Sequence, residues 1–83
     1  MVKPAKLFQR LLQGSRNLSF QEFQRLLEAF GFRLVRTKGS HHVYGRQGVE
    51  RPLIVQPNGK DAKAYQVEQF LDMVQAYGLN MDE

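Results

Sequence analysis

Apolar residues between positions 19 and 30 recur every three or four residues, which is the spacing of one helix face. Ser19 and Glu22 form the Ser-x-x-Glu pattern of a capping box, in which each side chain bonds the backbone N–H of the other residue. Gly31 follows as a residue suited to a left-handed helix stop. The pattern predicts a helix over 19–30.

The same periodicity predicts two more helices, over 4–13 and 63–77. Pro4 suits the first turn of the earlier segment and Gly14 its end, while Gly78 closes the later segment. A helix as short as 4–13 is marginal alone in water. We therefore expect it to pack on the rest of the chain.

Residues between the two longer helices contain three short runs rich in strand-forming types, 32–38, 41–46 and 51–56. The two-residue connection Gly39-Ser40 implies that the first two runs pair antiparallel. The predicted class is α+β, in the order α-β-β-β-α with an added N-terminal helix. Two helices would cover one face of a three-stranded antiparallel sheet.

Some residues allow two interpretations. Tyr44 fits either the core or a surface on which nucleobases stack. Residues 57–61 are predicted to form a loop, in which Asn58-Gly59-Lys60 could bind an anion but a plain loop is the simpler interpretation. Asp61 could cap the last helix. The phenylalanines on or beside the helix stripes are expected in the core: Phe20, Phe23, Phe30, Phe32 and Phe70.

Composition narrows the function. The 83 residues suffice for one small domain, and 42% of them are hydrophobic. The absence of cysteine excludes disulfides, Cys-ligated zinc and a thiol nucleophile. Apolar runs are too short for a membrane span or a secretory signal, so we expect a cytoplasmic protein without membrane contact.

The net charge of +4 is unevenly distributed. Residues 33–63 hold seven of the twelve cationic side chains and two of the eight acids, a net charge of +5. Residues 64–83 hold four acids and no Lys or Arg. Solvated faces would explain any single charge, but this segregation favours a surface that faces phosphates.

His41 and His42 are the candidate reactive side chains, because imidazole takes and gives protons near neutral pH. Adjacent strand residues point to opposite faces, so the two do not form a catalytic pair. The spacing of histidines and acids does not match a metal site, and we expect no metal and no small-molecule cofactor. His41 could simply end its strand beside the turn; if Val43 is a core residue, His41 lies at the rim of the core.

Cationic residues around this turn favour a catalytic interpretation of His41. Lys38 precedes the turn, and Arg36 and Arg46 could lie on neighbouring strands. Cations near a histidine can hold a phosphate and offset the charge that builds on it. RNA cleavage suits this arrangement, since the 2′-hydroxyl must lose a proton before it attacks its own phosphate.

The run Lys38-Gly39-Ser40-His41-His42-Val43-Tyr44 resembles the HicA family of toxin ribonucleases. The other family features lie on either side of this run in the expected order: a helix ending Phe30-Gly31-Phe32 before it, and the run Gly59-Lys60-Asp61 and a last helix ending Gly78-Leu79 after it. The resemblance covers about residues 18–79. It divides the chain into an N-terminal helical extension, 1–17, and a HicA-like domain, 18–83, within a single compact domain overall.

The resemblance implies a double-stranded-RNA-binding-like fold and a metal-independent endoribonuclease that cleaves messenger RNA. It implies His41 as the catalytic residue and a HicB-like antitoxin that covers the active site. A histidine common in the family after the third strand is absent here, where the residues are Gln56-Pro57-Asn58. Together with the charge pattern, we expect RNA contacts at Arg36, Lys38, Gly39, Ser40, Arg46 and Lys60. The alternatives are a non-catalytic RNA-binding module and a protein adaptor.

Overall fold

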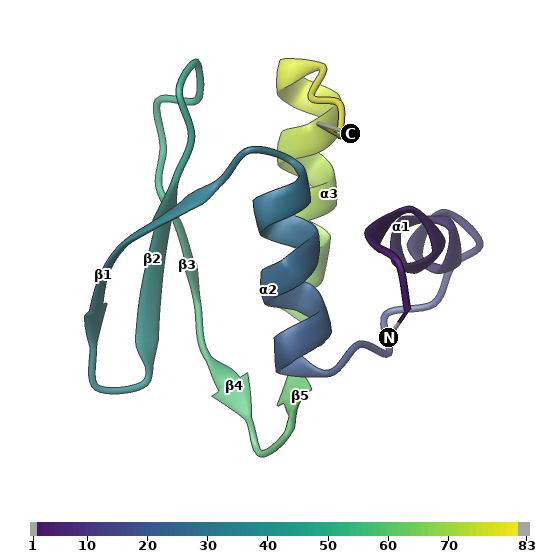
Figure 1. Cartoon of the computed structure of the whole chain (residues 1–83), viewed down its shortest axis with the longest axis horizontal. Helices are drawn as coiled ribbons and strands as arrows, with labels where there is room; N and C mark the ends of the chain where they lie inside the picture. Colours follow the sequence, from purple (N-terminus) through teal and green to yellow (C-terminus); the bar gives the residue numbers. More distant parts are fainter. Residues whose placement is uncertain (1, 82–83) are drawn as a thin grey trace.

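The computed structural model describes residues 2–81, which form three helices, a three-stranded antiparallel sheet and a two-stranded hairpin (Figure 1). The predicted α+β class and the order α-β-β-β-α with an added helix are confirmed. Among these residues, none of the helices combines the length and apolar character needed to cross a bilayer. The elements are α1 (Pro4–Leu12), α2 (Phe20–Ala29), β1 (Arg33–Lys38), β2 (His41–Gly45), β3 (Leu53–Val55), β4 (Pro57–Asn58), β5 (Asp61–Ala62) and α3 (Ala64–Tyr77).

Three layers succeed one another across the molecule: the sheet, then α2 and α3, then α1 (Figure 1). α1 buries Leu7 completely, in the same core cluster as the sheet and the other helices. Its Phe8 ring packs on Phe30, with the ring centroids 4.9 Å apart. The short first helix is therefore stabilised by burial against the helix layer, as expected for a segment of marginal intrinsic stability.

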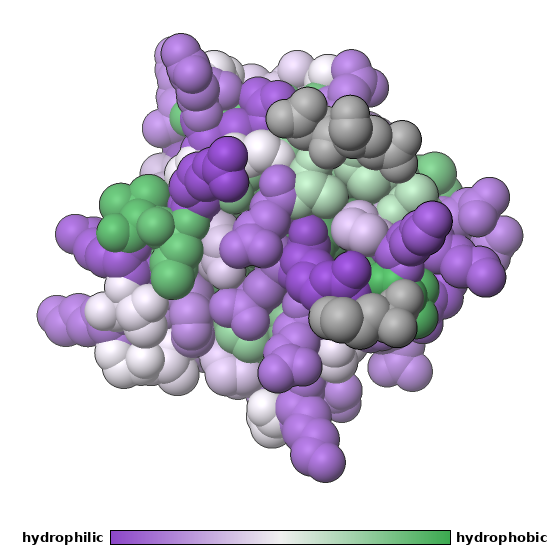
Figure 2. Space-filling view, in the orientation of Figure 1, coloured by the Kyte–Doolittle hydropathy of each residue, from purple (hydrophilic) through white to green (hydrophobic). Residues whose placement is uncertain are grey.

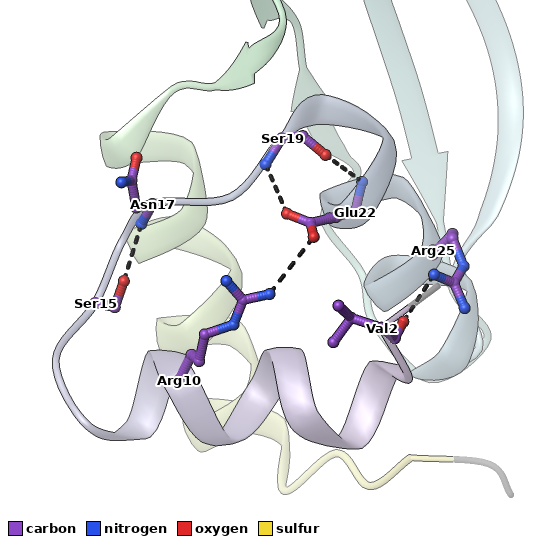
Figure 3. A network of polar contacts seen from close by, with 7 residues as sticks. All are labelled: Val2, Arg10, Ser15, Asn17, Ser19, Glu22 and Arg25. Atoms are coloured by element: carbon purple, nitrogen blue, oxygen red, sulfur yellow. Dashed lines mark hydrogen bonds and ion pairs between the residues drawn. The ribbon is translucent and has the colours of Figure 1, made fainter.

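Polar contacts also join α1 to α2 (Figure 3). The predicted capping box is present, with the Ser19 and Glu22 backbone N–H groups each donating to the other residue's side chain at 3.0 Å. The second carboxylate oxygen of Glu22 pairs with Arg10 of α1 at 3.5 Å. Glu22 thus starts α2 and links it to the neighbouring layer.

The centre of the core is aromatic. Phe70 of α3 meets three other rings edge-on, with centroids 5.2–6.2 Å away: Phe23, Phe30 and Phe32. All five phenylalanines expected in the core are buried. Tyr44 is a core residue as well, only 2% exposed, and its hydroxyl accepts a hydrogen bond from Gln24 Nε2 at 3.1 Å.

The two faces of the sheet differ. Tyr44, Leu53 and Val55 are buried under the helices, whereas His41, Val43 and Ile54 alternate with them and point to the other face. Val43 is half-buried and Ile54 is exposed, so this second face carries no helix layer. His41 therefore lies on the open face rather than at the rim of the core.

Figure 2 shows hydrophilic residues over most of the side on view, with smaller hydrophobic patches between them, one at the left where the sheet lies. Leu34 and Val35 of β1 are large exposed hydrophobic residues. The pairing of β1 with β2 shifts register between Leu34 and Arg36, which places a bulge at Val35. A bulge of this kind bends and twists the strand that carries it.

Three expectations for residues 51–63 were wrong. The third strand is limited to Leu53–Val55, and the predicted loop at 57–61 contains a β4–β5 hairpin that pairs Asn58 with Asp61. The backbone of Asp61 also forms an isolated antiparallel β-bridge with Ser19. Asp61 does not cap α3: the N-cap residue is Lys63, whose side chain makes no capping hydrogen bond. Strands of two residues are too short to show periodicity, so only their tertiary pairing reveals them.

Candidate active site

The candidate site is built on the Gly39-Ser40 turn between β1 and β2. Gly39 has a φ of +59°, while the residue after it has no positive φ. This combination matches a two-residue II′ hairpin, which takes glycine at its first central position. The turn pairs Lys38 directly with His41. Opposed residues of an antiparallel pair share a sheet face, so this ammonium and this imidazole lie on the same side.

His41 is exposed and lines a cleft of about 550 Å³ beside the edge strand β3. The other walls come from Arg51, from Ile54 of β3, and from Tyr65 and Gln66 of α3. The lining contains no acidic residue. An exposed imidazole beside cations is suited to contact with a phosphate and to proton transfer.

His42 lies in a different environment, on the helix side of β2. Its ring meets Phe20 edge-on, with centroids 5.0 Å apart. Its Nδ1 is 3.0 Å from the Ser40 carbonyl oxygen; a carbonyl only accepts, so Nδ1 carries the proton. His42 also lines a second hollow with Gly59 and Lys60. Packing and hydrogen bonding give His42 a structural role that His41 lacks.

The structure brings together only some of the expected RNA-binding residues. Arg36 pairs with Val43 and so shares the face of Lys38 and His41. Arg46 is held elsewhere, since its Nε donates to the Phe30 carbonyl at the end of α2 at 2.6 Å. Lys60 lies with His42 rather than in the His41 cleft.

Two residues of the cleft were not selected as candidates from the sequence. Arg51 was counted within the basic segment and predicted to begin the third strand, which gave no reason to single it out. Tyr65 lies in the first turn of α3, outside the apolar stripe, which was a weak signal that it serves something other than the core.

Residues 2–81 contain no second group of side chains that is a candidate reactive site. Within residues 2–81, no three His, Asp or Glu side chains gather as metal ligands. A larger hollow, of about 880 Å³, runs along α1 beside Lys3, Lys6 and Leu12, but it has no titratable group other than lysines. The open face with its adjoining cleft therefore remains the candidate site.

A family model described as the HicA toxin of bacterial toxin–antitoxin systems matches residues 20–76. The match spans α2, the whole sheet, the Gly-Ser-His turn and nearly all of α3, and it leaves out α1. Neither a curated protein nor a solved structure gave a match to the chain. The α+β architecture with its three-stranded antiparallel sheet is compatible with the fold of this family. The chain belongs to the HicA toxins of bacterial toxin–antitoxin systems, which implies an antitoxin as its partner.

Proposed function

We propose that this protein is an endoribonuclease that cleaves messenger RNA in the cytoplasm without a metal ion, and that a HicB-like antitoxin neutralises it. The observation that carries the proposal is the position of His41, exposed on the open face and directly opposite Lys38. Family membership supports a toxin role for the chain. The arrangement on the open face supports the choice of RNA as target.

The proposed reaction is an internal displacement at one phosphate. His41 accepts the proton of a 2′-hydroxyl, whose oxygen attacks the adjacent phosphorus while the bond from phosphorus to the 5′-oxygen breaks. The leaving oxygen takes a proton from the histidinium or from water. The products are a 2′,3′-cyclic phosphate and a 5′-hydroxyl end. In this proposal Lys38, Arg36 and Arg51 bind the phosphate oxygens, since Lys38 and Arg36 share the sheet face of His41 and Arg51 lines the same cleft. Fixed cations stabilise the charge that builds on the phosphate in the transition state.

The same face suits an antitoxin that blocks the site. Val35 and Ile54 are exposed on it, beside the cations of β1. An acidic partner with apolar residues at the centre of its surface would complement this pattern. Covering the face would also close access to His41.

The test is cleavage of single-stranded RNA in EDTA by the parent protein and by His41→Ala. We expect the parent to release cyclic-phosphate ends and the variant to lose about 100-fold to 10,000-fold in single-turnover rate, the usual contribution of acid–base catalysis. Circular dichroism should show an unchanged fold, because the His41 side chain is exposed. Cleavage by His41→Ala at the parent rate would exclude His41 as the catalytic group.

The competing function is RNA binding without cleavage. The cationic open face favours RNA as a ligand, and binding through phosphates weakens steeply with salt. Salt-sensitive binding with no cleavage of any RNA, and no growth arrest on expression, would favour this module over the nuclease. Such salt-sensitive RNA binding would also exclude a protein adaptor that binds no RNA.

A further inference from the structure

We propose that the cleft between β3 and α3 is a subsite for one nucleobase, in which the ring of Tyr65 is the stacking platform beside the phosphate held at His41. This inference rests on the proposed function for the identity of the ligand as RNA. It adds the position of the RNA nucleotide next to the reacting phosphate, and it makes an unstacked base the unit that the protein recognises.

The exposure of Tyr65 is the first observation. Tyr65 is 57% exposed, although it is a large aromatic residue directly before the buried residues Gln66 and Val67 of α3. It shares the cleft with His41 and Arg51, and none of the lining residues is acidic. The volume, about 550 Å³, is within the range of small-ligand sites. An aromatic face next to groups that bind phosphate matches one nucleotide, with a place for its base and a place for its phosphate.

Gln66 supplies the second observation, because it fixes the base of the cleft. This polar residue is only 5% exposed. Its Oε1 accepts from the Gln56 backbone N–H at 2.9 Å, and its Nε2 donates to the Tyr65 hydroxyl at 3.4 Å. One buried amide therefore joins the edge of the sheet to α3 and restrains the phenol. A platform that is already oriented loses less entropy when a base stacks on it.

The Gln56 side chain is the third observation. Its Oε1 is buried and has no hydrogen-bond donor among residues 2–81. Gln56 follows β3, one step beyond the pair His42–Val55, so it continues the ladder opposite His41. An amide that turned toward the cleft could accept from an exocyclic amino group of a base. A ligand donor would satisfy an acceptor that the protein leaves unpaired.

The cleft therefore favours single-stranded RNA. Bases within a duplex are stacked on each other and do not present a free face, whereas splayed bases of single strands stack on aromatic side chains. Such stacking is tolerant of sequence, because every base has a π-face. The subsite should thus bind any unpaired nucleotide, with preference added by hydrogen bonds at its edge.

Equilibrium binding of a short fluorescent 2′-fluoro RNA tests the subsite separately from cleavage, since that strand lacks the 2′-hydroxyl. We expect Tyr65→Ala to raise Kd about tenfold, the fold-change typical of one lost aromatic stack. Tyr65→Phe should bind nearly as the parent does, because the ring face remains. Tyr77→Ala is the matched control: this exposed tyrosine is at the opposite end of α3, about 18 Å along the helix axis from Tyr65.

Strands with a single abasic position identify the stacked base. The parent should lose affinity when the base in the cleft is missing, and Tyr65→Ala should lose little more, because the ring it would stack on is already gone. The proposal is overturned if Tyr65→Ala binds like the parent, if Tyr77→Ala loses as much, or if Tyr65→Phe is as weak as Tyr65→Ala. Tyr65-dependent binding without any cleavage would support the subsite and reject the nuclease. Cleavage with Tyr65-independent binding would do the reverse.

Discussion

Replacing His42 with alanine should weaken the fold while leaving RNA cleavage largely intact at temperatures where the protein stays folded. The structure separates the two histidines by environment, with His41 exposed on the open face and His42 packed on the helix side of β2. Because the two positions are adjacent, substitutions at them compare these environments with the same chemical change.

The magnitude follows from what His42 contacts. Its edge-on contact with Phe20, at 5.0 Å between centroids, is of a type that contributes about 0.5–1.5 kcal/mol. Its hydrogen bond to the Ser40 carbonyl adds about 0.5–1.5 kcal/mol, with the lower end more appropriate at a partly exposed site. Together they give about 1–2 kcal/mol, which lowers Tm by roughly 4–16 °C in a domain of this size.

Thermal and urea unfolding followed by circular dichroism measure this effect, with single-turnover cleavage recorded well below each variant's Tm. His41→Ala is the control, since it should keep the stability of the parent and lose cleavage. A His42→Ala protein that melts with the parent would refute the packing argument. A folded His42→Ala that loses as much cleavage as His41→Ala would show that His42 also takes part in cleavage and that its role is not only structural.

Two further predictions concern the core. Leu7→Ala should lower the free energy of unfolding in urea by about 2–5 kcal/mol, because Leu7 is fully buried although α1 lies outside the family match. Leu12→Ala is the control: Leu12 is 66% exposed, and its loss should change the unfolding free energy by about 0.5 kcal/mol or less. Equal effects of the two substitutions would contradict the three-layer packing. Burial raises the pKa of Tyr44, so the phenol ionises at a lower pH in the unfolded chain than in the folded protein. The neutral phenol therefore contributes fully to stability below a pH of about 10, and this contribution is lost as pH rises through the folded pKa. Tyr44→Phe should therefore lose less unfolding free energy above that pH than the parent, and identical pH profiles would contradict this reasoning.

Features that depend on local interactions could be predicted from the sequence. The helix at α2 is one, since the capping box, the apolar stripe and the glycine stop all act within a few residues of each other. The Gly39-Ser40 hairpin is another, because the length of the connection and the glycine conformation determine the turn. The position of His41 on one face and His42 on the other followed from the alternation of a strand.

Features that depend on tertiary contacts could not be predicted from the sequence. The β4–β5 hairpin is recognised through its pairing and its bridge to Ser19, and neither leaves a period in the sequence. Arg46 counted as one more cation near the turn, yet its guanidinium is occupied by the carbonyl at the end of α2. The role of Tyr65 depends on where α3 meets the edge of the sheet, which no spacing within the helix encodes.

The cations of β1 have a consequence for solubility. β1 and β3 are the two edges of the sheet. Beyond β3, Gln66 occupies the next backbone N–H, whereas β1 relies on the bulge at Val35 and on its charged residues Arg33, Arg36 and Lys38. Like charges and bulges discourage a second chain from pairing with an edge strand. Variants that neutralise Arg36 or Lys38 to inactivate the toxin would also make it easier for β1 to pair with another chain and aggregate. The activity of such variants therefore has to be compared at matched amounts of monomer.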